Sequence, residues 1–174
     1  MLISAIVSLL VATAQPQKTH GGANQVNAVS GCMNQWLFNG VWRLRVTGVE
    51  PYEESGQTGY SVNVEIRNGT RTTTNLHSTG VQGEGEGVDL VTNSGDTLKL
   101  DDLDYQHLGF QDVIQGAGAH RKLLYHFSPG TQDVANQKPA KFIMLIDKKQ
   151  ASGVHYTMPD PSFRVDLTCD KGAK

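Results

Sequence analysis

Three aspartates lie close together near the middle of the chain, at Asp101, Asp102 and Asp104. Carboxylate oxygens are the hard ligands that calcium prefers, and extracellular modules bind calcium through such groups. The segment lacks the glycine and the terminal glutamate of an EF-hand loop, and a solvated turn accounts for three aspartates equally well. Calcium is therefore the one cofactor that the sequence suggests, and an ordinary turn is the alternative.

The six histidines show no spacing that is typical of a zinc site. The two nearest in sequence, His120 and His126, would share one face of a strand but lie about 20 Å apart, too far for one ion. Glu84 and Glu86 resemble an acid/base pair, but nothing in the sequence brings their carboxyls together. No activated nucleophile is evident either. The sequence therefore predicts a protein without catalytic residues, one that is not an enzyme.

The two cysteines, Cys32 and Cys169, bracket most of the chain. In an exported protein an even number of cysteines favours a disulfide over free thiols, so we predict a Cys32–Cys169 bridge. The alternative is a lipid anchor on Cys32, because Val29 to Cys32 resembles a lipoprotein cleavage box. That box requires an apolar segment before it, whereas residues 15–27 are polar.

The first residues have the character of a signal peptide. An apolar run from Leu2 to Ala12 ends in Ala12-Thr13-Ala14, the small-x-small pattern that precedes signal-peptidase cleavage, although no lysine or arginine stands before it. We therefore predict a signal peptide over residues 1–14, a flexible polar leader over 15–31 and a secreted or periplasmic protein. The run is too short to cross a bilayer, and no later segment is long enough, so we expect no transmembrane segment.

Composition indicates one ordinary domain, which we place at residues 32–170. Lysine and arginine total 15 against 17 acidic residues, for a formal net charge of -2, and no basic tract is present. Such a chain lacks the positive field that phosphate backbones require. Nucleic acid is therefore not an expected partner.

Apolar and polar residues alternate along several short segments, which is the period of a half-buried strand. In the clearest case Trp42, Leu44 and Val46 would face a core. The next strand stops at Asn68-Gly69-Thr70, which is also a glycosylation sequon if the source is a eukaryote. The predicted strands are 42–47, 60–67, 88–91, 97–100, 123–127, 142–146 and 163–169.

These segments and the breaker-rich turns between them predict an all-β fold, an immunoglobulin-like antiparallel β-sandwich of about seven strands. Residues 103–114 are ambiguous, so we allow at most one short helix. Cys169 lies an even number of residues from Phe163 and Val165, so its side chain should point to the same inward face of the strand. This position predicts a shielded sulfur. Trp42 is expected in the core, whereas Trp36 is equally compatible with a core or a ligand-facing position.

Several segments resemble a large family of exported bacterial immunoglobulin-like domains of unknown function. The resemblance covers about residues 40–169 and consists of strand alternation and turns. It implies the fold and an exported location, and it carries over no catalytic residues. The segments concerned are Val41–Val49, Tyr60–Asn68, Leu90–Asp96, and Ile114–Gly118 with the following Leu123–Phe127.

A rigid sandwich without a catalytic set is typical of a binding or adhesion module that presents loops to an unknown protein or glycan partner. The alternative is a secreted protease inhibitor of immunoglobulin-like fold, although the glycine-rich loop from Gly83 to Gly87 is too flexible to be a preorganised inhibitory loop. A hydrolase with its site on the loops is the third hypothesis.

Overall fold

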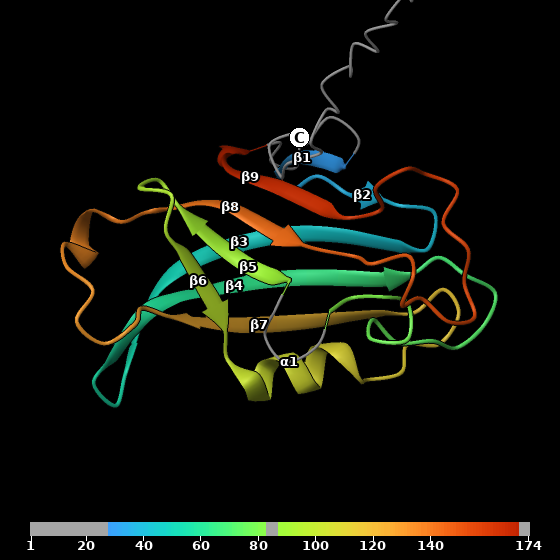
Figure 1. Cartoon of the computed structure of the whole chain (residues 1–174), viewed down its shortest axis with the longest axis horizontal. Helices are drawn as coiled ribbons and strands as arrows, with labels where there is room; N and C mark the ends of the chain where they lie inside the picture. The colour runs from blue at the N-terminus through green and yellow to red at the C-terminus, as the bar shows by residue number, and fades with distance from the viewer. Residues whose placement is uncertain (1–27, 83–86, 171–174) are drawn as a thin grey trace, which may run out of the picture.

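The structure is a computed structural model that describes residues 28–82 and 87–170 (Figure 1). Within these residues the chain forms nine strands, one short α-helix and one 3-10 turn. In chain order they are β1 (Val29–Met33), β2 (Leu37–Phe38), β3 (Trp42–Glu54), β4 (Gln57–Asn68), β5 (Val88–Thr92), β6 (Thr97–Leu100), α1 (Asp102–Gly109), β7 (Gly118–His126), η2 (Val134–Asn136), β8 (Pro139–Met144) and β9 (Phe163–Asp170).

The strand order identifies the architecture. Hydrogen bonds join the strands as β1-β9-β8-β5-β6-β7-β4-β3-β2. Immunoglobulin constant domains place strands A, B, E and D in one sheet and C, F and G in the other. If β3 to β9 are lettered A to G, β3-β4-β7-β6 reproduces the order of the first sheet and β5-β8-β9 that of the second, and the β5-β6 hairpin joins the two layers into one continuous sheet. Figure 1 shows β5 crossing in front of β3.

The predicted all-β, immunoglobulin-like sandwich is therefore confirmed, and its seven predicted strands correspond to β3 through β9. The described residues add two short edge strands, β1 and β2. β1 begins at Val29, before the predicted domain start at Cys32, and it pairs parallel to β9 in an otherwise antiparallel arrangement. The predicted signal peptide and residues 15–27 of the predicted leader lie outside the described residues.

Inward-facing side chains of both layers form one hydrophobic core. Trp42 is fully buried, as predicted, and its indole N–H donates to Thr79 Oγ1 at 2.8 Å. This bond satisfies the polar atom of a large apolar side chain, which is required in a water-free interior. The other largest fully buried side chains are Tyr105, Tyr125, Phe142 and Phe163.

The helix α1 is the one α-helix of the described residues, as predicted, and it packs against β7 (Figure 1). Its inward side buries Tyr105 and Leu108. The backbone N–H of Asp101, just before the helix, donates to the carbonyl of Leu124 at 3.0 Å. The helix ends at Gly109, because glycine has a low helix propensity. α1 thus covers part of the core that the two sheets leave open.

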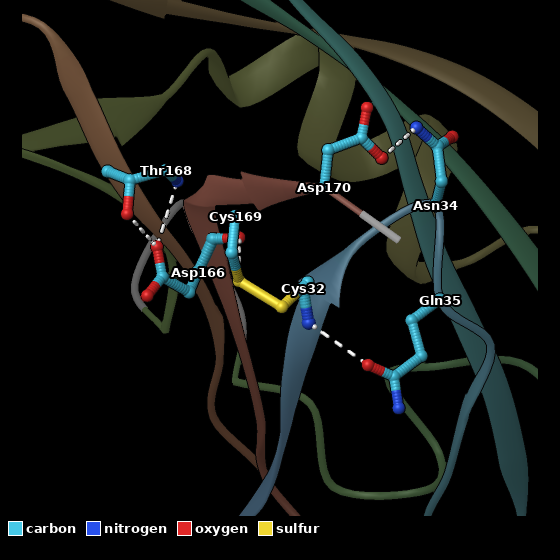
Figure 2. Close-up of a disulfide and its surroundings, with 7 residues drawn as sticks. All are labelled: Cys32, Asn34, Gln35, Asp166, Thr168, Cys169 and Asp170. Carbon is cyan, nitrogen blue, oxygen red and sulfur yellow. Dashed lines mark hydrogen bonds between the residues drawn. A yellow bond between two sulfur atoms is a disulfide. The ribbon is translucent and has the colours of Figure 1, made fainter. Parts of the chain in front are cut away.

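The predicted disulfide joins Cys32 of β1 to Cys169 of β9 (Figure 2). Both cysteines are therefore engaged, so Cys32 cannot carry a lipid anchor in this state. Neighbouring contacts reinforce the junction: Asn34 Nδ2 donates to Asp170 Oδ1 at 2.9 Å, and the N–H of Cys32 donates to Gln35 Oε1 at 3.2 Å. The bridge holds the first described strand to the last.

The prediction that the sulfur of Cys169 is shielded is wrong. Phe163 and Val165 are buried, but Leu167 and Cys169 on the same side of β9 are only half-buried, and so is Cys32. Parity is maintained along the strand, and Leu167 still packs against the core as a partly buried side chain, but Cys169 lies two residues nearer the end of the strand. The bridge is therefore only partly buried.

We predict that replacing both cysteines by serine lowers the free energy of unfolding by about 2–5 kcal/mol. The bridge spans 137 residues, and closing so long a loop removes much conformational entropy from the unfolded chain. Urea denaturation of the oxidised and serine proteins measures the difference. Free thiols that titrate in the native oxidised protein would contradict the pairing.

Candidate functional site

The outer surface of the sheet β3-β4-β7 carries a group of arginines and aromatic rings. Successive side chains point to opposite faces of a strand. Because Trp42, Leu44 and Val46 are buried, Arg43 and Arg45 lie on the outer face. We call the following set the arginine face: Trp36, Phe38, Arg43, Arg45, Glu65, Arg67 and His120.

One row of this face runs from Trp36 through Arg45 and Glu65 to His120. The strand register places Arg45 opposite Glu65 and Glu65 opposite His120. Arg45 Nη2 lies 2.7 Å from Glu65 Oε2, and its guanidinium lies 4.7 Å from the centroid of the Trp36 ring. His120 Nδ1 lies 3.5 Å from the other oxygen of Glu65. The charge of Arg45 is thus largely balanced within the row.

The second row differs because two arginines stand directly opposite each other. Arg43 pairs with Arg67 across β3 and β4, and like charges in this position are destabilising. Both side chains are exposed, and neither takes part in an ion pair of the described residues. Aromatic rings hold them instead: the Arg43 guanidinium lies 4.5 Å from the Phe38 ring, and that of Arg67 lies 4.4 Å from Trp36.

Two glycines give this second row its space. A Cβ at Gly118, opposite Arg67, would lie 3.0 Å from Arg67 Cγ, so the absence of a side chain lets the arginine stem lie along the sheet. A Cβ at Gly69 would lie 2.9 Å from the Phe38 ring. Phe38 is still 42% exposed. The two guanidiniums and this aromatic edge are thus presented together to solvent.

A guanidinium donates two parallel hydrogen bonds to a carboxylate, sulfate or phosphate, and an aromatic ring beneath it limits its motion. Two such groups side by side form an anion-binding surface. The alternation around Trp42 implies that Arg43 points outward, but this surface was not predicted, because the Arg43–Arg67 pairing depends on the strand register. The available signal was the pattern of arginines on the polar side of two consecutive strands.

The structure gives Asp104 a structural role. Its Oδ2 accepts a hydrogen bond from the N–H of Leu124 at 2.6 Å, which ties α1 to β7. Burial raises the pKa of the Asp104 carboxyl above its ordinary value, whereas the bond from Leu124 acts in the opposite direction and the charge of Asp101 adds to the rise. Desolvation of the charged form is the dominant cause.

The predicted calcium site stays a prediction. Asp101 and Asp104 flank the beginning of α1, and the side chain of Asp102 lies outside the described part of the structure. Among the side chains that are described, no group of three or more histidine, cysteine, aspartate or glutamate residues could hold a metal ion. Glu84 and Glu86 also lie outside the described residues.

The two histidines of β7 are far apart in the sheet, as their spacing predicts. His120 pairs with Glu65 in the arginine face, whereas His126 pairs with Gly59 at the other end of β4. The His126 ring meets the Tyr52 ring edge-on, with 5.3 Å between centroids. The two imidazoles therefore belong to different surroundings.

The sequon at Asn68 is not accessible in the folded protein. Asn68 is buried, and its amide nitrogen donates to the carbonyls of Thr72 at 2.8 Å and Val113 at 2.7 Å. Its amide oxygen accepts from the N–H and the hydroxyl of Thr70. All polar atoms of this side chain are engaged in shaping the turn after β4, so a glycan cannot be attached without unfolding it.

Comparisons with known proteins give little further information. No family model matches the chain, and no curated protein matches it. Among solved structures, the yjhA protein from Bacillus subtilis is similar, with 12% sequence identity and a TM-score of 0.46. The match covers 78% of this chain and 98% of that protein.

Replacing Asp104 by asparagine tests its electrostatic role. A carboxyl whose pKa is raised by folding holds its proton more tightly in the native state, so it lowers stability as pH rises through that pKa. Asp104→Asn keeps an acceptor for Leu124 and has no charge to desolvate. We expect a higher melting temperature than wild type at pH 7 and a smaller difference at pH 3.

Thermal melts at both pH values measure this effect, and Glu50→Gln, at an exposed position, is the matched loss of one carboxylate. A variant that is less stable than wild type at pH 7 would show that the ionised form of Asp104 is required. Such a loss would be expected if this carboxylate bound calcium, and melts with and without added calcium would then identify the cause.

Proposed function

We propose that this protein is an exported, non-enzymatic binding module that recognises an acidic glycan through the arginine face. The observation that carries the proposal is the directly opposed pair Arg43 and Arg67. Each is exposed, each is stacked on an aromatic ring, and neither has an acidic partner among the described ion pairs. A bound anion would remove the repulsion that folding leaves in this row.

The form of the surface supports binding rather than catalysis. The arginine face is the outside of a sheet, open to water, whereas catalytic groups act in sites that exclude solvent and bring their reacting atoms together. Its residues lie on paired strands, which hold their spacing better than loops. The partner-contacting surface that we propose is therefore a sheet face and not the loops that the sequence favoured.

A glycan fits this face better than the other candidate partners. Exposed guanidiniums recognise the carboxylate and sulfate groups of acidic polysaccharides in a bidentate manner. The positive charge of the arginine face is confined to one small area of a chain whose formal net charge is -2. Nucleic acid would require a wider basic field. The protease-inhibitor alternative stays a prediction, because its loop includes residues 83–86, outside the described residues.

The double variant Arg43→Gln/Arg67→Gln tests the proposal with polygalacturonate and heparin as probes. Hydrogen bonds to charged groups contribute about 1.5–3 kcal/mol each, so we expect at least tenfold weaker binding at physiological ionic strength. Isothermal titration calorimetry measures the affinity. Removing the opposed charges should leave the fold intact and slightly more stable.

The control variant, Lys138→Gln/Lys149→Gln, removes two exposed positive charges elsewhere and should bind like wild type. Equal losses in both double variants would mean that only the net charge matters, and the arginine face would then not be a site. Neutral dextran should not bind. If an acidic peptide such as polyglutamate bound the arginine face while both polysaccharides did not, the glycan assignment would be wrong.

Export is supported by the apolar first residues and by the disulfide, since such bridges persist in oxidising compartments. Within the described residues, no helix is long and apolar enough to span a membrane. We propose cleavage after Ala14, which also agrees with the resemblance to exported bacterial immunoglobulin-like domains. Mass spectrometry of the exported chain should find an N-terminus at Gln15, and a chain that retains Met1 would contradict it.

A further inference from the structure

A further row of outward side chains borders the arginine face on β4 and β7. Residues two apart on a strand point to the same face, and these two strands pair without a register shift. Asn63 and Lys122 are opposite each other, so they lie on the outer face, one row past Glu65 and His120. Lys122 is exposed and takes part in no ion pair of the described residues. The row beside the arginine face therefore presents another unpaired cation.

The three rows differ in charge. Arg43 and Arg67 are two cations without an acidic partner among the described ion pairs. In the next row Arg45 and Glu65 form an ion pair at 2.7 Å, so their formal charges cancel. The row of Lys122 adds one positive charge. Along the strands, the outer surface is thus positive, then neutral, then positive again.

Strand geometry sets the distance between the two positive rows and the length of the surface. Arg67 and Asn63 are four residues apart on β4, and a strand rises about 3.3 Å per residue, so the rows are separated by about 13 Å. One row further on, the exposed Glu50 stands opposite Ser61. Its carboxylate repels any further anionic group. The three rows therefore accommodate a short stretch of a ligand.

Glu65 makes the middle row unsuitable for an anion. Its Oε2 is bonded to Arg45, so this guanidinium is already engaged by a carboxylate. An anionic group above the row would meet the negative charge of Glu65. The side chain of His120 is 81% exposed, and its ring can exchange a hydrogen bond with a hydroxyl or an amide. The middle row therefore favours an uncharged part of the ligand.

We infer that these three rows are specific for a polysaccharide in which acidic and uncharged sugars alternate. The inference rests on the proposed recognition of an acidic glycan and names the class of that glycan. One acidic group binds Arg43 and Arg67, and the next acidic group along the chain binds Lys122. The uncharged sugar between them lies over Glu65 and His120. A polysaccharide with an acid group on every sugar would instead place a carboxylate against Glu65.

Two hexasaccharides of equal length test the inference. Hyaluronan has a carboxylate on every second sugar, whereas oligogalacturonate has one on every sugar. If the number of charges alone decided affinity, hexagalacturonate would bind more tightly. We expect the hyaluronan hexasaccharide to bind the oxidised exported protein about threefold more tightly at physiological ionic strength, because it avoids the repulsion from Glu65. Isothermal titration calorimetry measures both affinities.

Glu65→Gln separates the pattern of charges from their number. It removes the carboxylate from the middle row and leaves Arg45 able to bind an anion. We expect hexagalacturonate to bind about fivefold more tightly than it binds wild type, and the hyaluronan hexasaccharide to change by less than about twofold. The preference for the alternating ligand is then lost. Glu53→Gln, at an exposed position near the tip of the β3-β4 hairpin, is the matched loss of one carboxylate and should keep the preference.

Lys122→Gln tests the second positive row. We expect it to weaken binding of the hyaluronan hexasaccharide about threefold, because one acidic group loses its cation. Lys149→Gln, also at an exposed position, is the matched loss of one lysine and should bind like wild type. Circular dichroism of each variant establishes that the fold is retained.

The outcomes distinguish this inference from the proposed function. If neither hexasaccharide bound in a manner that depends on Arg43 and Arg67, both would be wrong. If binding depended on these arginines but hexagalacturonate bound as tightly as hyaluronan or more tightly, the proposed function would stand and the alternating pattern would be wrong. Equal effects of Glu65→Gln on both ligands, or equal effects of Lys122→Gln and Lys149→Gln, would also overturn the inference.

Discussion

The antiparallel register between β3 and β4 is the constraint on which the rest of the structure depends. It places Leu44 opposite Ile66 and Val46 opposite Val64 in the core, and by the same alternation it brings Arg43 opposite Arg67 on the outer face. A slip of one residue would reverse both faces at once, so the hydrophobic effect that fixes the core also fixes the two cations side by side. The repulsion between them is tolerated because it is small compared with the burial of that core.

A bulge in β3 extends this control to the far end of the sandwich. The register shifts between Val46 and Gly48, so that the side-chain parity of β3 is reversed beyond this point. Without the bulge, Tyr52 would have the parity of the buried Trp42; with it, Tyr52 reaches His126 on the outer side of β7. The same strand therefore contributes arginines to the outer face at one end and the Tyr52 ring that meets His126 at the other. The arginine face retains an unfavourable feature, its opposed charges, as binding sites commonly do.

The sequence predicted the elements that are indicated by a pattern within one short segment, because the alternation of apolar and polar residues shows which side chains of that segment are buried. Seven strands, the short helix and the burial of Trp42 follow from such local patterns, and the disulfide follows from cysteine number and compartment. β1 and β2 were missed because they are short and cover edges, where alternation is weak. The burial of Cys169 was predicted wrongly because parity says nothing about how far the opposing layer extends. The arginine face depends on the register between strands, which no local pattern specifies.

The first described segment connects these features. β1 pairs with β9, β2 pairs with β3, and the N–H of Asn34 between them donates to the carbonyl of Val46 at 2.9 Å, so this segment covers edges of both sheets. The disulfide attaches it to the end of β9, and Trp36, four residues beyond Cys32, stacks on Arg45 and Arg67. The bridge thus holds the segment that positions Trp36, so the oxidised state of the cysteines is also the state in which the arginine face is assembled.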